Sequence, residues 1–407
     1  MSEHFGALET RDPEQREREL MVRLPAQIAR ARTAPYFAES LKHVDAAAVT
    51  SRAALARLPV LRKHQLIELQ QAARPFGGLV ATARARLARI YASPGPIYEP
   101  EGRGADYWRT ARALFAAGFR GGDLIHNSFS YHMTPGAWIL EAGAQALGCA
   151  VFPGGVGQTE QQAQAMADLQ PDGYVGTPSF LRILLEKADE LGLAIPSLRK
   201  ALVSGEAFLP PVREALRARG IEGYQAYATA DLGVIAYESP AREGLVVDED
   251  VIVEIVRPGS GDPVADGEVG EVVVTTFNPD YPLLRFGTGD LSAVLPGASP
   301  CGRSNMRIKG WLGRADQTTK VKGMFVHPEQ VDAVVKRHPE IRRARLVVTN
   351  PDSSDAMALL CEGNGDATLA ARIAESLREL TRLRGEVAFV SALPNDGKVI
   401  SDARKYD

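Results

Sequence analysis

The chain has 407 residues, 45% of them apolar, which is too long for one small core and predicts two or three domains. A net charge of -3 and a pI near 6.2 give no electrostatic basis for binding nucleic acid or an anionic membrane. The N-terminus is charged, unlike a signal peptide, and no apolar run approaches the roughly 20 residues that cross a bilayer. Three dispersed cysteines favour a reducing cytoplasm without disulfides.

Residues 1–84 are predicted to be helical. Apolar positions recur at helical spacing from Glu14 to Arg32. Ser51 starts a short capped helix that Pro59 ends, and 61–69 forms another. We expect these helices to cover the outside of a larger domain.

Residues 85–242 alternate between strand and helix, which predicts a parallel sheet with helices on both faces. The expected strands are 88–92, 123–127, 148–153, 173–176 and 200–204, and the expected helices are 105–118, 138–147, 158–169, 178–191 and 211–219. Ligands of such sheets bind beyond the carboxyl ends of the strands. The loops to search are therefore 93–100, 127–136, 153–158, 176–179, 204–208 and 227–233.

Residues 243–315 read as a small β-barrel or sandwich, with strands over 246–256 and 270–276. A further strand is expected to end at Arg285 and to lead into a tight turn at Gly287-Thr-Gly289. Asp290 at this turn could accept two hydrogen bonds from a vicinal diol such as a ribose. Arg314, which follows on the next turn, could reach the same ligand.

Residues 316–407 are predicted to form an independent α+β lid. Its expected order is a strand at 321–326, a helix at 328–337, paired strands at 343–349 and 357–361, a helix at 367–382 and a strand at 387–390.

Several motifs, in this order, resemble the phenylacetate–coenzyme A ligase group of the AMP-forming adenylate synthetases, from about residue 22 to the C-terminus. Phe152-Pro-Gly-Gly-Val-Gly-Gln-Thr-Glu-Gln161 resembles the group's Gly-Gly-Gln-Thr-Glu loop, and the segment from Tyr227 to Glu238 resembles its adenine and metal loop. Arg285 to Asp290 resembles its ribose turn, 307–317 its domain hinge, and Gly397-Lys398 its adenylating lysine.

The resemblance implies an α/β N-terminal domain over 1–315 and a mobile α+β domain over 316–407. It implies that a carboxylic acid reacts with MgATP to give an acyl-adenylate, which then passes its acyl group to CoA. A homodimer is also implied. The cofactors and partners would be ATP, Mg²⁺, CoA and a small acid, with no nucleic acid or membrane.

The resemblance also implies roles for individual residues. Lys398 would stabilise charge on the bridging oxygens, Asp316 would be the hinge, and Asp231 would hold Mg²⁺. Asp290 would bind the ribose and Tyr227 would stack on adenine. The other residues at the nucleotide are expected to be Ser204, Gly205, Glu206, Ala228 and Arg314.

The phosphate loop departs from the family pattern Ser-Ser-Gly-Thr-Thr-Gly-Lys-Pro. The aligned segment here is Ser93-Pro-Gly-Pro-Ile-Tyr-Glu-Pro100, in which Ser93, Gly95 and Pro100 match. Both threonines and the lysine are absent, two prolines cannot donate to a phosphate, and Glu99 would place a negative charge where a cation helps. The phosphate cradle is therefore expected to be weakened.

Two further differences concern metals. The family's Thr-Glu pair is Ala230-Asp231 here, which loses a hydroxyl and shortens the carboxylate by one methylene. Some members of the group also carry a Cys/His cluster, whose matching positions here are Ser239, Ala241, Val246, Ser299 and Cys301. Only Cys301 remains as a ligand, so we expect that metal to be absent.

Two functions stay open from the sequence. The chain either adenylates an acid and forms a CoA thioester, or it has lost ATP chemistry and binds nucleotide, acyl-adenylate or acyl-CoA as an acyl-transfer or sensing protein. The acid pocket is expected between the loop after 127 and the loops at 204–233. An aromatic wall there suits a phenylacetate-like acid. Its candidate residues are Phe129, Tyr131, His132, Pro135 and Gly136, with Ala228 opposite.

Overall fold

A computed structural model describes residues 3–93, 96–315, 317, 319–321, 324–350 and 355–404. The chain forms two compact units and crosses between them several times. The first unit comprises Met1–Val253, Val274–Phe286 and Leu295–Trp311, and the second comprises Glu254–Val273, Gly287–Val294 and Leu312–Asp407.

The first unit begins with the helices α1 (Pro13–Ala31), α2 (Pro35–Ser40), α3 (Arg52–Leu55) and α4 (Gln65–Ala72). The helix capped by Ser51 is confirmed, since its hydroxyl accepts from the Ala54 amide. The helix expected over 61–69 is wrong at its start. Leu61–Arg62 form strand β1 because the Leu61 amide donates to the Arg285 carbonyl at 3.1 Å, and the helix begins only at Gln65.

A mixed sheet forms the centre of the first unit. Five of its strands run parallel in the order β5 (Ala150–Pro153), β4 (Leu124–Asn127), β6 (Gly173–Gly176), β7 (Lys200–Val203) and β8 (Glu222–Thr229). Helix α5 (Thr110–Ala116) precedes the first of these strands in the chain. The connecting helices are α6 (Gly136–Leu147), α7 (Thr159–Leu169), α8 (Pro178–Glu190) and α9 (Pro210–Ala218). The predicted alternation is confirmed. Strand β5, expected at 148–153, is the edge strand and is partly exposed rather than buried.

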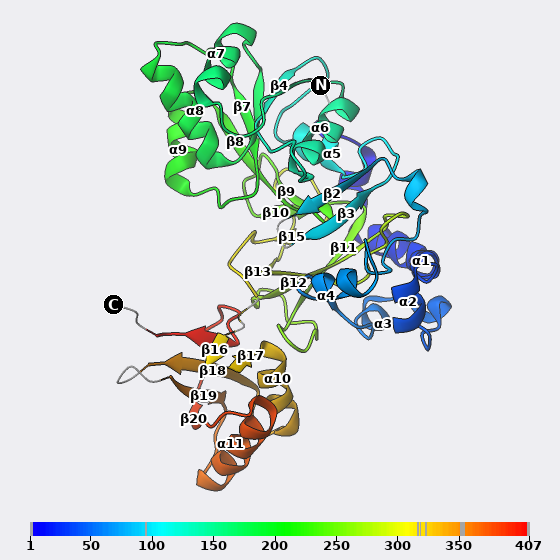
Figure 1. The fold of residues 1–407 in the computed structure, drawn as a ribbon, viewed down its shortest axis with the longest axis vertical. Coiled ribbons are helices and arrows are strands. Elements are labelled where there is room, and N and C mark those ends of the chain that lie inside the picture. The colour runs from blue at the N-terminus through cyan, green and yellow to red at the C-terminus, as the bar shows by residue number, and fades with distance from the viewer. Residues whose placement is uncertain are drawn as a thin grey trace. The chain divides into compact units, whose positions relative to one another are not determined.

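Helices cover both faces of these parallel strands, as predicted (Figure 1). Successive residues of β6 belong to separate cores: Tyr174 packs with Leu181 and Leu216 of α8 and α9, whereas Val175 packs with Leu114 and Ile139 of α5 and α6. Alternate side chains of a strand point to opposite faces, so each face of the sheet has its own apolar layer. This packing fixes the edge from which the candidate loops emerge.

The segment 227–238, expected to be a ligand loop, is mostly an antiparallel hairpin. Strand β8 continues to Thr229 and β9 runs over Gly233–Glu238, with a bulge between Tyr227 and Ala228. The run from Val234 to Tyr237 is fully buried, which favours a central strand over a loop. The sheet continues through β10 (Leu245–Val247) to β15 (Arg307–Ile308) and β14 (Val294–Leu295).

The expected phosphate loop is also a hairpin. Strands β2 (Arg89–Ser93) and β3 (Ile97–Glu101) pair antiparallel, with Ser93 opposite Ile97 and Tyr91 opposite Glu99. The open loop predicted over 93–100 is therefore wrong for the residues that the structure describes. Pro94 and Gly95 lie outside them.

The β-rich part contains a sheet in the order β1-β13-β12-β11, from β11 (Val251–Val256), β12 (Gly270–Thr276) and β13 (Phe286–Ser292). The single strand expected over 246–256 is two strands in different sheets, because Asp248 turns inward to pair with Arg112. The turn expected at Gly287-Thr-Gly289 is wrong as well. These residues lie within β13, where Gly289 alone has positive φ, +75°.

The C-terminal part follows the predicted order except at its start, where the single strand expected over 321–326 is two strands that pair antiparallel. It contains β16 (Thr319–Val321), β17 (Met324–Val326), α10 (Pro328–Arg337), β18 (Arg343–Thr349), β19 (Ala356–Glu362), α11 (Ala367–Thr381), β20 (Glu386–Val390) and β21 (Ile400–Asp402). The predicted pairing of β18 with β19 is confirmed. Strand β21 was not predicted, and it pairs parallel with β18. Val331, Leu346, Ile373 and Ile400 belong to the core of this part.

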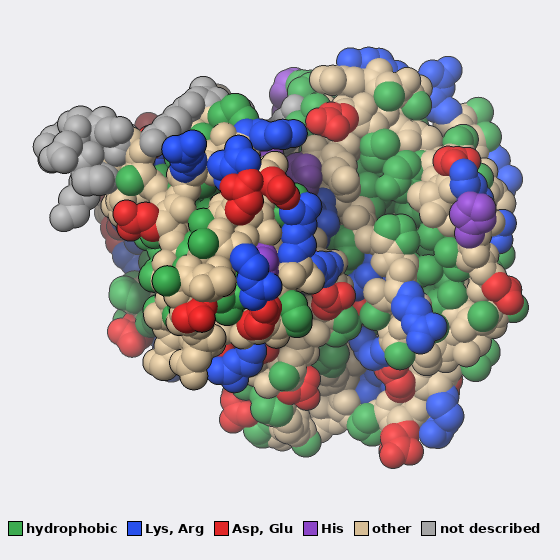
Figure 2. All heavy atoms as spheres, turned by 90° about the horizontal axis from the view of Figure 1, so that it is seen from below, with side chains coloured by type: hydrophobic (Ala, Val, Ile, Leu, Met, Phe, Trp, Pro, Cys, Tyr) green, Lys and Arg blue, Asp and Glu red, His purple; other side chains and the backbone are tan. Residues whose placement is uncertain are grey.

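Acidic and basic side chains are interspersed on the face that Figure 2 draws. Within the described part of the chain, no helix is both long and apolar enough to cross a membrane.

Candidate active site

The loops that follow β4, β6 and β7 come together at the carboxyl edge of the parallel strands. Phe129 connects them: a Cβ added at Gly136 would lie 3.5 Å from its ring, and one added at Gly205 would lie 3.6 Å from it. Gly205 is left-handed, with φ +81°. The structure thus brings a predicted acid-pocket residue against the predicted nucleotide loop within the first unit.

Hydrogen bonds between neighbouring loops hold this edge. The Ser204 hydroxyl donates to the Ala226 carbonyl at 2.8 Å, and Glu206 accepts from the Ser179 amide at 3.4 Å. The Asn127 side chain donates to the Tyr131 hydroxyl and to the Ala137 carbonyl, both at 3.0 Å. These hydrogen bonds therefore hold the backbone of the loops from which the side chains at this edge project.

The other expected acid-pocket residues differ in their surroundings. Tyr131 donates to Glu141 at 2.6 Å and contacts Trp138 edge-on, and burial raises the pKa of its phenol. His132 is exposed, so it is not enclosed with Phe129. Ala228 is half-buried beside the core, and Tyr227, also half-buried, precedes it across the bulge.

The centre of the first unit contains an ion pair that the sequence did not indicate. The Lys63 Nζ lies 2.7 Å from Asp231 Oδ2; the Lys63 side chain is 29% exposed and the Asp231 side chain 0%. Lys63 precedes α4 in the N-terminal part, in a segment predicted to be a covering helix. Its separation of 168 positions from Asp231 left no local pattern by which to find it.

Glu99 lies in the same cluster. It was expected to oppose phosphate binding with a negative charge, and its surroundings in the structure contradict this. It is fully buried and accepts hydrogen bonds from the amide and the hydroxyl of Ser93. Burial and, second, the nearby Asp231 charge raise the pKa of Glu99 to about 8. At neutral pH the side chain is therefore mostly the uncharged acid.

Two buried oxygens of this cluster have no hydrogen-bond partner within the described ranges: Asp231 Oδ1 and the Tyr281 hydroxyl. Burial, together with the charges of Asp231 and Glu99, raises the pKa of the Tyr281 phenol. A buried carboxylate oxygen without a partner costs free energy unless a ligand, ion or water meets it. Asp231 Oδ1 therefore fits a hard cation that takes its other ligands from water or substrate. No set of three or more His, Cys, Asp or Glu side chains suited to a metal occurs among the described residues.

The predicted ribose residues meet in the second unit. Arg314 Nη1 donates to Asp290 Oδ1 at 2.8 Å, and the backbones of these residues form a β-bridge. A Cβ at Gly289 would come within 3.0 Å of the Arg314 guanidinium, so glycine lets the guanidinium lie against the strand. The Asp290 side chain is 11% exposed and that of Arg314 is 54% exposed, which leaves the arginine accessible to solvent.

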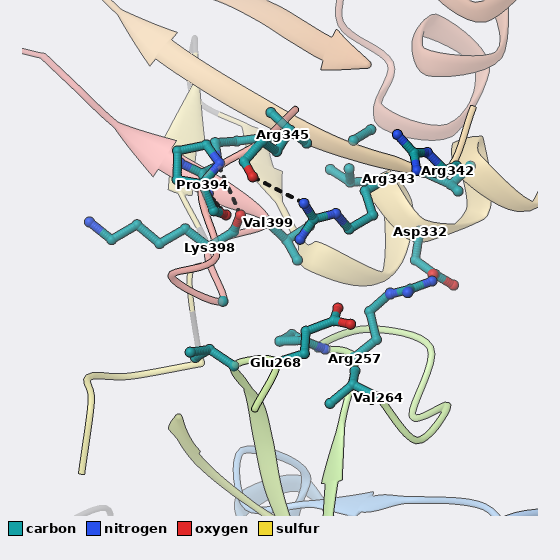
Figure 3. Close-up of a pocket in the computed structure, with 17 residues that line it drawn as sticks. Arg257, Val264, Glu268, Asp332, Arg342, Arg343, Arg345, Pro394, Lys398 and Val399 are labelled. Carbon is teal, nitrogen blue, oxygen red and sulfur yellow. Dashed lines mark hydrogen bonds between the residues drawn. The ribbon is translucent and has the colours of Figure 1, made fainter. Parts of the chain in front are cut away.

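Lys398 follows Gly397 in a turn of the second unit. In Figure 3 its side chain extends away from the pocket that its backbone lines. Gly397 has φ +70°, and a Cβ there would lie 2.7 Å from Val269 and 3.1 Å from Leu291, the neighbour of Asp290 on β13. Asp316, the expected hinge, and Gly95, of the expected phosphate loop, lie outside the described residues.

Three of the positions that match the family's Cys/His cluster lie together, and one of the three is a cysteine. Cys301 Sγ lies 3.1 Å from the Ser299 hydroxyl and 3.2 Å from that of Ser239. Burial disfavours the thiolate, but the hydrogen bonds with Ser239, Ser299 and Arg303 lower the pKa of Cys301 to about 7.

The comparisons with known proteins agree with this fold. Residues 110–278 match the family described as AMP-binding enzyme. The chain is 32% identical to the phenylacetate-coenzyme A ligase of Aromatoleum evansii over 335 residues, 78% of this chain and 74% of that protein. It is also 32% identical to that of Thermus thermophilus over 363 residues, 82% of this chain and 79% of that protein.

A solved structure, an open conformation of 2-hydroxyisobutyryl-CoA ligase in complex with 2-HIB-AMP and CoA, is 25% identical with a TM-score of 0.74. The alignment covers 98% of this chain and 95% of that chain. The fold and the matches define an AMP-forming acid–thiol ligase, a class that uses ATP and CoA. The chain belongs to the phenylacetate–coenzyme A ligase family.

Proposed function

We propose that this ligase adenylates an aromatic, phenylacetate-like acid with MgATP and transfers the acyl group to CoA. The carboxylate would attack the α-phosphorus and release pyrophosphate. The CoA thiolate would then displace AMP from the acyl-adenylate.

The observation that carries the ATP-dependent proposal is the Lys63–Asp231 pair beside Glu99. The altered hairpin lacks the family's phosphate-loop lysine, but Lys63 supplies an ammonium to the same cluster from elsewhere in the chain. Glu99 is mostly uncharged at neutral pH, so it adds little repulsion toward a phosphate. Two of the sequence-based objections to phosphate binding, the missing lysine and the charge of Glu99, are thereby weakened.

Asp231 would hold Mg²⁺ through Oδ1, the atom without a protein partner. Mg²⁺ commonly takes one or two carboxylates plus substrate phosphates, and when bound it would neutralise phosphate charge. Lys63, already paired to Oδ2, would present its remaining N–H groups to a phosphate oxygen. Ser93 and Gly95 would complete the phosphate side.

For the nucleotide we propose that Asp290 binds the ribose hydroxyls and that Tyr227 stacks on adenine. Arg314, held by Asp290 yet exposed, would bind a phosphate or ribose oxygen. Ser204, Gly205, Glu206 and Ala228 would line the nucleotide. For the acid we propose a pocket walled by Phe129 and Tyr131, with His132 nearby and Gly136 as the small floor.

Lys398 would bring its ammonium to the bridging oxygens as negative charge develops on them. We propose that residues 1–315 and 316–407 act as two functional domains and that rotation at Asp316 separates adenylation from thioester formation. We further propose a cytoplasmic location and a homodimer, which light scattering on the purified protein would test.

Pyrophosphate release from MgATP tests the proposal, measured with a panel of aryl and short acyl acids, with and without CoA, beside Lys398→Ala. Release that requires one acid, and that falls at least 100-fold in the variant, supports an adenylating ligase. Failure of every acid, with measurable nucleotide or acyl-CoA binding, would favour the acyl-transfer or sensing function instead.

A further inference from the structure

The turn that carries Lys398 is held by side chains from two distant segments. Gln317 reaches it from the segment before β16, and Arg345 reaches it from β18. Both residues contact backbone atoms of the turn and leave the Lys398 side chain untouched.

Gln317 makes three hydrogen bonds, to three of the four residues in the run 397–400. Its Nε2 donates to the Gly397 carbonyl at 3.0 Å, and its Oε1 accepts from the amides of Val399 and Ile400 at 2.5 and 2.7 Å. Two backbone N–H groups can face only the oxygen of a carboxamide, so these contacts fix the orientation of the side chain. One glutamine thus spans the residues on both sides of Lys398.

Arg345 holds the other side of the turn. Its Nε donates to the Lys398 carbonyl at 3.0 Å, and its Nη2 donates to the Pro394 carbonyl at 3.2 Å and pairs with Asp396, as the dashed lines to the carbonyls show (Figure 3). Its side chain is 10% exposed. The Asp396 carboxylate also accepts from the Lys398 amide at 3.1 Å, which closes the turn.

The lysine itself is free to reach a ligand. Lys398 is exposed, and no carboxylate pairs with its ammonium within the described ranges. A long, flexible side chain loses rotamer entropy when its charge is held in one place, so a backbone that is already fixed spares the further cost of ordering the turn. Fixing the backbone is therefore what determines where the ammonium is presented.

We infer that Gln317 is a positioning residue for Lys398 in adenylation. This rests on the proposed function, in which Lys398 acts at the bridging oxygens. Gln317 directly follows the proposed hinge in sequence, so a rotation there would act on the residue that holds the lysine turn. We expect the two hydrogen bonds that Oε1 accepts from the Val399 and Ile400 amides to matter more than the one that Nε2 donates to the Gly397 carbonyl.

The test compares Gln317→Ala with Gln317→Glu, which keeps the acceptor and loses the donor. Gln330→Ala is the matched control. Gln330 also bridges backbone groups of the C-terminal part, donating to Leu380 at 2.7 Å and accepting from His327 at 2.9 Å, but it does not contact the lysine turn. Adenylation is followed by pyrophosphate exchange, and thioester formation by CoA consumption from supplied acyl-adenylate.

For Gln317→Ala we expect kcat for adenylation to fall about tenfold or more, with KM for ATP and the thioester step within about threefold of wild type. Gln317→Glu should recover most of the loss. Gln330→Ala should lower thermal stability without slowing adenylation more than thioester formation. Equal losses in both half-reactions, or wild-type adenylation in Gln317→Ala, would overturn the inference.

Amide hydrogen exchange on the ligand-free protein separates this inference from the proposed function. We expect Val399 and Ile400 to exchange at least tenfold faster in Gln317→Ala and at near wild-type rates in Gln330→Ala. If the wild-type protein adenylates no acid, the proposed function fails whatever the exchange shows. If it adenylates and these amides exchange unchanged in Gln317→Ala, the positioning role fails alone.

Discussion

Replacing Lys63 with alanine tests the central ion pair most directly. The substitution leaves Asp231 with both carboxylate oxygens buried and without a basic partner among the residues that the structure describes, since Oδ1 already lacks one and Oδ2 loses the ammonium at 2.7 Å. Lys63 also lowers the pKa of Glu99, so that pKa should rise further above about 8 in the variant.

The size of the effect follows from distance and burial. Two unit charges at 2.7 Å attract with about 6 kcal/mol at an effective dielectric constant near 20, before desolvation is subtracted. Breaking a buried pair from one side costs about 3–5 kcal/mol. Because the Lys63 side chain is 29% exposed, water can enter the vacated space, and we expect a loss of about 2 kcal/mol.

Lys200→Ala provides the matched control. Lys200 also lies 2.7 Å from a carboxylate, that of Asp123, with side chains 20% and 16% exposed, away from the candidate site. Thermal melts should show a smaller loss for Lys200→Ala, on the order of 1 kcal/mol. In pyrophosphate exchange, Lys63→Ala alone should lose about 100-fold in kcat/KM for ATP, equivalent to about 2.7 kcal/mol. Equal kinetics in the two variants would refute the assignment of Lys63 to phosphate binding.

Three further predictions concern single residues. Glu99 has a pKa of about 8 against 4.5 for an ordinary glutamate, so the folded state binds its proton more tightly. Its contribution to stability is complete below pH 4.5 and falls as the pH rises to 8. Glu99→Gln should abolish this decline, and a variant whose melting temperature differs between pH 5.5 and 8.5 as much as that of the wild type would contradict it. Arg314→Ala should leave the melting temperature within about 2 °C, since its partly exposed pair with Asp290 is worth under about 1 kcal/mol, yet raise KM for ATP about tenfold; an unaltered KM would count against its role at the nucleotide. Iodoacetamide at pH 7 should label Cys301, whose pKa is lowered to about 7, at least tenfold faster than the two thiols with pKa raised to about 11, and equal labelling by mass spectrometry would disprove this.

The elements that periodicity predicted well have a local cause. Helix α10 was expected at 328–337 and is found there, because proline begins it and one apolar face packs on the sheet. The parallel strands were found because short apolar runs alternate with amphipathic helices. Element boundaries shifted where a distant strand offered a partner, as Arg285 does for Leu61.

The candidate site was only partly readable from sequence. Motif order located Asp290, Arg314 and Lys398, and the structure places the first two in direct contact. The first strand of the hairpin was predicted, at 88–92, but 93–100 was mistaken for a loop because its Pro and Gly residues predict a break in the chain. Pairing of Tyr91 with Glu99 continues the hairpin beyond that break as a second strand.

The sequence by itself determined the family, the order of most strands and helices and the positions of the motifs, since these depend on residue type and spacing along one chain. Tertiary structure alone decided the charges at the centre of the site. A carboxylate's ionisation depends on burial and on neighbours within a few ångströms, and such neighbours can lie anywhere in the chain. Lys63 is 168 positions from Asp231, and Glu99 became a mostly neutral acid only by folding into the same buried cluster.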